Sequence, residues 1–504
     1  QDVIPVDIAR AYQLAQQDYA LQNIHQPADA QALDTARKRL VFEELFLLTC
    51  GLQLLRQRRR DVAGPACRRM SMEPFYRRLP FALTGAQRRA IADAVEDMVS
   101  GKPMNRLCQG DVGSGKTMVA AACIWFAVEN GWQTALMAPT EILARQHYQG
   151  LAPLLARFSI RCALLTGSTR SRERREILAG LADGSIDLCI GTHALLTEDV
   201  QYQKLGLVVT DEQHRFGVNQ RAALSQKAED PHLLVLSATP IPRTLALVIY
   251  GDLDVSVIDE LPPGRRPIKT FHYTDAARLK LFGFMRQEIA KGRQVYVVYP
   301  LIKESEAMDY KDLTDGYEAI SRDFPLPQYV TAICHGKMKP ADKEESMRQF
   351  KQGEAHILVA TSVIEVGVDV PNATVMVIES AERFGLSQLH QLRGRVGRGG
   401  EQSYCILMSG EKLSRESRAR LEAMCETNDG FRLAELDLKL RGAGDINGTL
   451  QSGMAFDLKI ASPTADVQIL TVSREAAAEI LAADPALAHP QNRGLEALRR
   501  RYSG

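Results

Sequence analysis

The sequence predicts an α/β protein in which two parallel β-sheet units, each flanked by helices, follow one another along the chain. Residues 110–117 read G-x-x-x-x-G-K-T, a phosphate-binding loop between an apolar run suited to a strand and a buried helical stretch. Short apolar runs alternate with amphipathic segments on both sides of a proline-rich break at residues 261–267, which predicts a linker. With 504 residues, the chain is also too long for a single hydrophobic core.

The composition is that of an ordinary globular protein, with 45% hydrophobic and 24% charged residues. The net charge of +1 does not by itself indicate a nucleic-acid partner. No apolar run approaches the roughly 20 residues that a membrane-spanning helix needs, and no signal peptide is visible, although the chain starts at Gln1 rather than Met. The nine scattered cysteines contain no C-x-x-C pair, so we expect reduced thiols and no zinc site.

The phosphate-binding loop is the centre of the predicted site. Its glycines let several backbone N–H groups point at one anion, and the N-terminus of the following helix adds its positive end. Lys116 is expected to reach the β- and γ-phosphates of a nucleotide, and the Thr117 hydroxyl to ligate Mg²⁺. The alternative is a chance glycine-rich turn, which the complete spacing disfavours. The predicted phosphate-site residues are Gly110, Gly113, Ser114, Gly115, Lys116 and Thr117.

Two adjacent carboxylates, Asp211 and Glu212, follow the apolar run at residues 205–210. In open α/β sheets, ligands gather at the carboxyl ends of the strands. A nucleotide site with Mg²⁺ needs one carboxylate for the metal's water shell and a second to orient and deprotonate the attacking water. Adjacent carboxylates at a strand end fit those two roles.

Residues 1–80 are predicted to be helical, with helices over residues 9–24 and 33–60. The second helix ends in a basic run at residues 56–60, which either contacts a phosphate backbone or is a solvated helix end. Thr84 is a plausible N-cap for the next helix. Gln87 in that helix has an amide that can both donate to and accept from an adenine.

The second α/β unit has predicted strands but no phosphate loop of its own; the strands cover residues 294–299, 330–334, 356–360 and 373–378. A helix from about Ser387 leads into residues 391–398, Q-L-R-G-R-V-G-R. Arginines at this spacing can clamp a γ-phosphate across a cleft, as an arginine finger does. A basic nucleic-acid or salt-bridge patch is the alternative interpretation.

Taken in order, these motifs resemble a superfamily-two helicase motor with two RecA-like lobes, over roughly residues 81–410. The stretches that carry the resemblance are Phe81 with Gln87, then residues 110–117, 138–140 (Ala-Pro-Thr), 166–168 (Thr-Gly-Ser), 211–214 (Asp-Glu-Gln-His), 237–239 (Ser-Ala-Thr), 360–362 (Ala-Thr-Ser), 367–370 (Gly-Val-Asp-Val) and 391–398.

Residues 211–218 and 380–398 narrow the resemblance to the RecG family of bacterial branch-migration helicases. The related coupling factor Mfd usually has Glu at the position of Gln213. The segment at residues 427–453 also resembles both families, in which it forms a helical hairpin and loop that couple ATP hydrolysis to translocation on duplex DNA. Gly-Ala-Gly-Asp at residues 442–445 departs from the family's common Gly-Pro-Gly-Glu, and Leu450 stands where Arg is common.

RecG proteins also carry an N-terminal oligonucleotide-binding wedge, which needs some five short strands. The residues before Phe81 do not supply them, so we expect a chain without the wedge, either as a fragment or by loss. The resemblance implies a helical connector over residues 1–80, a first lobe over 81–262, a second lobe over 263–412, and a coupling hairpin with tail over 413–504.

The resemblance implies ATP and Mg²⁺ bound between the lobes. Lys116 and Thr117 would then hold phosphates and metal, Asp211 the Mg²⁺ shell, Glu212 would be the water-activating base, and Arg395 and Arg398 the finger candidates. The adenine would meet Phe81 and Gln87, and the ribose Asp369. The implied DNA contacts are Pro139, Thr140, Thr166, Gly167, Ser168, His193 and Thr361, and the implied coupling residues are Ser237, Thr239, Gln391, Arg420, Arg441 and Gln451.

The implied function is that of an ATP-dependent double-stranded DNA translocase and helicase, which reverses replication forks and migrates Holliday junctions in recombination and repair. Its partners would be duplex and branched DNA, with single-stranded DNA-binding protein as a further candidate; we expect a monomer in the bacterial cytoplasm, at the nucleoid, without a membrane. The alternatives are an Mfd-like motor fragment, an RNA unwinding enzyme and a non-hydrolysing DNA-binding scaffold. Intact Lys116, Glu212, Arg395 and Arg398 argue against the scaffold.

Overall fold

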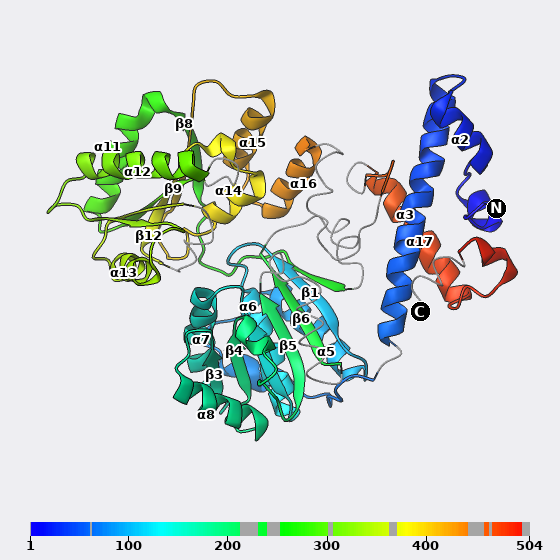
Figure 1. The fold of residues 1–504 in the computed structure, drawn as a ribbon, viewed down its shortest axis with the longest axis horizontal. Coiled ribbons are helices and arrows are strands. Elements are labelled where there is room, and N and C mark those ends of the chain that lie inside the picture. Colours follow the sequence, from blue (N-terminus) through cyan, green and yellow to red (C-terminus); the bar gives the residue numbers. More distant parts are fainter. Residues whose placement is uncertain are drawn as a thin grey trace.

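The computed structural model contains two parallel β-sheets, each flanked by helices, and a separate group of helices (Figure 1). The predicted α/β class with two successive lobes is therefore confirmed. The residues that the structure describes are 2–60, 63–211, 230–238, 253–300, 306–361, 370–441, 458–462 and 466–495.

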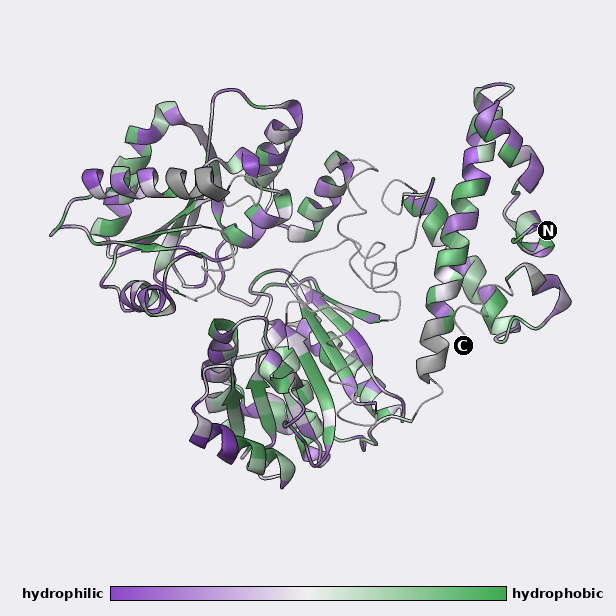
Figure 2. Ribbon diagram, in the orientation of Figure 1, coloured by the Kyte–Doolittle hydropathy of each residue, from purple (hydrophilic) through white to green (hydrophobic). Residues whose placement is uncertain are grey.

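The first lobe is built on a seven-stranded parallel sheet in the order β3-β4-β2-β5-β6-β1-β7. Its strands are β1 (Asn105–Gly110), β2 (Gln133–Met137), β3 (Cys162–Leu165), β4 (Leu188–Gly191), β5 (Leu205–Asp211), β6 (His232–Ser237) and β7 (Asp254–Ile258). The described helices of this lobe are α5 (Gly85–Val99), α6 (Lys116–Glu129), α7 (Glu141–Ala156) and α8 (Ser171–Ala182). Along β2, Leu136 packs into one core cluster while Ala135 and Met137 pack into another, so both faces of the sheet are covered. Strands covered on both faces tend to be mostly apolar, as β4 and β5 are, and the sheet of this lobe is largely green in Figure 2.

The second lobe holds a six-stranded parallel sheet in the order β10-β11-β9-β12-β13-β8. Its strands are β8 (Lys269–Thr274), β9 (Gln294–Tyr299), β10 (Thr331–Cys334), β11 (Ile357–Thr361), β12 (Ala373–Ile378) and β13 (Tyr404–Ser409), with helices α11 (Arg278–Ala290), α12 (Glu306–Asp323), α13 (Pro340–Lys351) and α14 (Leu386–Arg393). The four predicted strands are confirmed to within one residue. The prediction missed β8 and β13, and it also missed β7 in the first lobe.

A short helical hairpin follows the second sheet, made of α15 (Arg415–Glu426) and α16 (Gly430–Arg441). The carboxylate of Asp429 accepts hydrogen bonds from the backbone N–H groups of Phe431 and Arg432, and so begins α16. Leu433 of α16 packs against the core of the second lobe. In Figure 1, α16 lies beside the gap between the lobes.

The N-terminal helices are α1 (Val6–Ala11), α2 (Gln17–His25) and the long α3 (Ala30–Arg60), and α17 (Val467–Ala483) packs along α3 (Figure 1). The prediction of one helix over residues 9–24 is wrong, because Gln13 adopts a left-handed φ of 51° that ends α1. The packing joins the two ends of the chain: Phe46 of α3 and Ala477 of α17 share one buried cluster. The carboxylate of Glu44 also accepts the backbone N–H groups of residues 459–461.

The segment before the first sheet belongs by its packing to the first lobe. In α4 (Glu73–Arg78), Phe75 is fully buried and its ring lies 5.2 Å from that of Phe158 and 5.6 Å from that of Trp125. The predicted domain boundaries, including the one at residue 80, remain predictions.

All nine cysteines are free in this structure. No helix in the described ranges is both long and apolar enough to cross a membrane.

Candidate nucleotide and nucleic-acid site

The phosphate loop runs from the end of β1 into α6. Gly113 and Gly115 take left-handed φ values of 76° and 83°, which side chains rarely adopt. A Cβ on Gly115 would come within 2.1 Å of the Gln87 amide nitrogen, so glycine is needed there for space as well. The sequence therefore folds this segment into the tight turn that the motif predicts.

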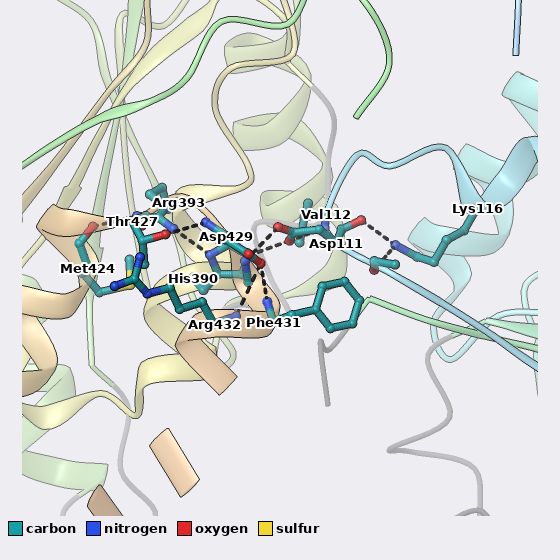
Figure 3. A network of polar contacts seen from close by, with 12 residues as sticks. Asp111, Val112, Lys116, His390, Arg393, Met424, Thr427, Asp429, Phe431 and Arg432 are labelled. Atoms are coloured by element: carbon teal, nitrogen blue, oxygen red, sulfur yellow. Dashed lines mark hydrogen bonds and ion pairs between the residues drawn. The ribbon is translucent and has the colours of Figure 1, made fainter. Parts of the chain in front are cut away.

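Lys116 is the first residue of α6, and its side chain turns back over the loop. Its Nζ donates to the carbonyl oxygens of Gly110 and Asp111, at 2.8 Å each (Figure 3). The hydroxyl of Ser114 is buried and has no hydrogen-bond partner among the described residues. An ammonium group, a buried hydroxyl and the N-terminus of a helix make a donor set that fits a polyphosphate.

The predicted adenine residues lie beside this loop in different surroundings. The amide nitrogen of Gln87 donates to the Ser114 carbonyl, and its amide oxygen accepts from the backbone N–H of Thr84, which caps α5 as predicted. Phe81 is half exposed. Gln87 therefore supports the phosphate loop in this structure, and its contact with an adenine remains a prediction.

Asp211, predicted to hold the Mg²⁺ shell, stands at the end of β5. Its Oδ2 lies 2.6 Å from Nε2 of His147 on α7, a residue that the sequence analysis missed. Only β6 separates β5 from β1 in the sheet, so Asp211 and Thr117 lie at the same edge. Mg²⁺ keeps most of its waters and needs only one or two protein oxygens, so a hydroxyl and a carboxylate fit it. Among the described residues no three metal-binding side chains cluster.

The residues predicted to contact DNA in the first lobe follow three neighbouring strands, β3, β4 and β2. Thr140 accepts from the Leu143 N–H and so caps α7, directly after β2. Ser168, in the loop after β3, donates from its N–H and hydroxyl to the Glu141 carboxylate. His193 is exposed after β4. The structure thus brings these loops to one edge of the sheet, while their contacts with DNA remain predictions.

The second lobe reaches the phosphate loop through three contacts. His390 Nε2 lies 2.5 Å from Oδ1 of Asp111, a loop residue without an assigned role in the sequence analysis. Gly394 approaches Val112 so closely that a Cβ there would lie 2.7 Å from the valine Cβ. Arg265, in the predicted linker, donates to the carbonyl oxygens of Val112 and Gly397, at 2.7 and 2.9 Å. The motif at residues 391–398 therefore lies against the loop.

The electrostatics of Asp111 reflect these contacts. Burial alone raises the pKa of its carboxyl group. Hydrogen bonding and charge from His390, the Val112 N–H and the Lys116 charge act in the opposite direction and lower the pKa below its usual value. Asp111 is therefore a carboxylate at neutral pH.

The remaining predicted residues are distributed more widely. Ser237 and Thr361 are buried at the ends of β6 and β11. Three more predicted residues are partly buried. Gln391 lies near the end of α14, and Arg395 and Arg398 lie between α14 and β13. Arg420 of α15 donates to the Phe384 carbonyl and the Ser417 hydroxyl, both at 3.3 Å. Glu212, Thr239, Asp369 and Gln451 lie outside the described residues, as does the side chain of Arg441.

Three family models match the chain in succession. They are a DEAD/DEAH box helicase model over residues 84–248, a helicase conserved C-terminal domain over residues 278–400, and the C-terminal part of domain 3 of ATP-dependent DNA helicase RecG over residues 427–501. Their order agrees with the order of the two lobes and the hairpin.

Whole-chain comparisons point to the same group of proteins. ATP-dependent DNA helicase RecG of Synechocystis sp. is 49% identical over 493 residues, which cover 97% of this chain and 59% of that protein. The protein of that name from Bacillus subtilis is 46% identical over 493 residues, covering 97% and 72%. A solved structure of RecG bound to a three-way DNA junction superposes with a TM-score of 0.76 at 43% identity, covering 93% of this chain and 62% of that one. The chain thus spans about three fifths of the length of the Synechocystis relative.

Proposed function

This chain belongs to the RecG family of ATP-dependent DNA helicases, and from that premise we propose that it uses ATP hydrolysis to move along duplex DNA and remodel branched DNA. The branched substrate is supported by the relative whose solved structure holds a three-way DNA junction. Reversal of replication forks and migration of Holliday junctions are the reactions that such movement would drive.

The observation that carries the proposal is the meeting of residues 391–398 with the phosphate loop. Gly394 lies against Val112, and Arg265 joins the Val112 carbonyl to that of Gly397, between the two candidate finger arginines. An arginine finger stabilises phosphoryl transfer only when its guanidinium reaches the phosphates, so the segment that carries it must lie against the phosphate loop. Because this loop and these arginines come from different lobes, hydrolysis and lobe movement are coupled in this proposal.

Each candidate residue has a specific role in hydrolysis. Lys116 would bind the phosphates of ATP, while Thr117 and Asp211 would hold the shell of Mg²⁺, which neutralises phosphate charge when bound. Glu212 would accept the proton of the attacking water. Arg395 and Arg398 would stabilise the charge that develops on the transferred group.

The loops after β2, β3 and β4, which form a polar edge of the first sheet, would bind DNA together with Thr361 of the second lobe. Hydroxyl groups and backbone N–H groups bind phosphates without reading bases, which suits a protein that moves along any sequence. The hairpin and Gln451 would convert lobe movement into translocation. We further propose that the protein acts as a monomer at the nucleoid in the bacterial cytoplasm, with single-stranded DNA-binding protein as a partner.

The test is the ATPase rate of the full chain with four additives: a three-way DNA junction, linear duplex DNA, single-stranded RNA, and no nucleic acid. We expect the junction and the duplex to stimulate hydrolysis and the RNA not to do so. Lys116→Ala, which removes the phosphate-binding charge, should abolish the stimulated rate and serves as the background control. Stimulation by RNA alone would favour an RNA unwinding enzyme, and no hydrolysis under any condition would favour a DNA-binding scaffold.

A further inference from the structure

Asp111 is an unexpected residue for a phosphate loop. It is the second residue of the motif, its side chain is only 18% exposed, and it is ionised beside a site that must accept a strongly anionic ligand. Like charges at short distance disfavour binding. An ionised Asp111 should therefore weaken nucleotide binding, and none of the roles in hydrolysis described above belongs to this residue. A compensating role is therefore to be expected in its contacts with other parts of the chain.

The side chain of Asp111 contacts two parts of the chain beyond the first lobe. Oδ1 accepts from Nε2 of His390 on α14, at 2.5 Å (Figure 3). Oδ2 accepts from the backbone N–H of Gly430, the first residue of α16, at 3.3 Å. The phosphate loop therefore holds the hairpin directly through Gly430 and indirectly through α14.

Arg393 extends this contact into the hairpin and fixes the state of His390. Its Nη2 lies 2.8 Å from Nδ1 of His390, and a guanidinium can only donate, so Nδ1 accepts and Nε2 carries the proton given to Asp111. The Nη1 of Arg393 donates to the carbonyl oxygens of Met424 and Thr427, at 2.7 and 2.8 Å. These carbonyls belong to the end of α15 and to the turn before α16.

The same residue is tied to the phosphate-binding lysine. The backbone carbonyl of Asp111 accepts from Lys116 Nζ, so a single residue holds the lysine with its main chain and the hairpin with its side chain. A Lys116 side chain engaged with phosphates would leave that carbonyl. Phosphate charge near the loop would also repel the Asp111 carboxylate.

We propose that Asp111 is a positioning residue that clamps the α15–α16 hairpin to the phosphate loop, and that phosphates engaging Lys116 loosen this clamp. The nucleotide site is thereby linked to the coupling element by a path of side chains from Lys116 through Asp111 to Gly430. This inference rests on the proposed function for the identity of the nucleotide and for the role of the hairpin.

Hydrogen exchange of the backbone amides of α16 tests the clamp without any need for activity. Asp111→Asn keeps the shape but removes the charge and one of the two acceptor oxygens, so His390 and the Gly430 N–H can no longer both be accepted. In the nucleotide-free full chain, we expect it to speed exchange at residues 430–441 by about tenfold to hundredfold, the effect of losing hydrogen bonds to a charged group. Asp187→Asn is the matched control, because that carboxylate likewise accepts from one side chain and from a backbone N–H, both of Arg161, but within the first lobe.

His390→Ala removes the partner of Asp111 in the second lobe and should also speed exchange at α16. Both residues act through one contact. The fold increase in the exchange rate of the double variant should therefore be smaller than the product of the fold increases of the two single variants. If Asp111→Asn destabilises the whole first lobe, exchange will also speed up in β1. In that case, the exchange rate of α16 in His390→Ala is the measurement that tests the clamp. Exchange at wild-type rate in α16 of either variant, or fully multiplicative effects, would overturn the clamp.

The second arm adds the non-hydrolysable nucleotide AMP-PNP. It should speed α16 exchange in the wild-type chain and change little in Asp111→Asn, where the clamp is already lost. No change in the wild-type chain, at a concentration that saturates binding, would overturn the link to the nucleotide. Neither arm uses DNA or hydrolysis, so a chain that fails the ATPase test could still pass this one, and the two failures are distinguishable.

Discussion

Replacing Arg393 with methionine should detach the helical hairpin from the second lobe. Arg393 is buried, with 1% of its surface exposed, and it donates to the carbonyls of Met424 and Thr427 and to His390. Methionine fills a similar volume but donates no hydrogen bond. The buried Met424 carbonyl then loses this donor, whereas the partly exposed Thr427 carbonyl can turn to water.

The expected cost follows from that difference. A buried carbonyl left without a donor costs about 1–3 kcal/mol. Burial of the guanidinium disfavours its charged form and lowers the pKa of Arg393, and the substitution removes this desolvation cost. We therefore expect the hairpin docking to lose about 2 kcal/mol of stability in total. Limited proteolysis within α15 and α16 should accelerate about thirtyfold, while cleavage in the first lobe stays unchanged.

Arg432→Met on the exposed side of α16 is the control for that experiment. It makes the same change of residue type on the hairpin itself, where no buried carbonyl loses a donor. If Arg393→Met leaves the hairpin as protected as Arg432→Met does, then the hydrogen bonds of Arg393 do not hold the hairpin.

Two further predictions concern other contacts. Burial lowers the pKa of His232 from 6.5 to about 4. Between these pH values the unfolded chain binds more protons than the folded one, so the free energy of unfolding should fall by ~3 kcal/mol as the pH drops from about 6.5 to 4. Glutamine can also donate and accept, so His232→Gln should flatten this pH dependence in denaturant titrations, and an unchanged slope would contradict it. Arg265→Ala should lower kcat for ATP by about tenfold to hundredfold with little change in KM, because Arg265 positions the candidate finger segment rather than binding nucleotide. The exposed Arg266→Ala is the control, and an equal loss in both variants would refute the role of Arg265.

The sequence predicted the fold well where the pattern was local. The phosphate loop, the apolar strands buried on both faces and the proline-rich linker each carry their signal in consecutive residues. β8 was missed because it lies at the sheet edge with side chains that are partly or fully exposed, so its sequence, Lys-Thr-Phe-His-Tyr-Thr, lacks a continuous apolar run. The break at Gln13 could not be foreseen, because a non-glycine residue rarely takes a left-handed conformation.

The candidate site was predictable for its motifs and not for its long-range partners. Nothing in the sequence pairs His147 with Asp211, 64 residues apart, because only the packing of α7 on the sheet brings them together. Asp111 and His390 are 279 residues apart and come from different lobes. The linker prediction identified the proline break, but it could not show that Arg265 within it touches the phosphate loop. Such contacts depend on tertiary structure, which no local pattern encodes.

Displacement of the third strand from a DNA triplex by the full chain reports movement along duplex DNA and needs no branched substrate. With ATP, we expect displacement that depends on hydrolysis, and none with AMP-PNP or with Lys116→Ala. DNA-stimulated hydrolysis by the wild-type chain without any displacement would contradict the claim that the chain is a duplex DNA translocase.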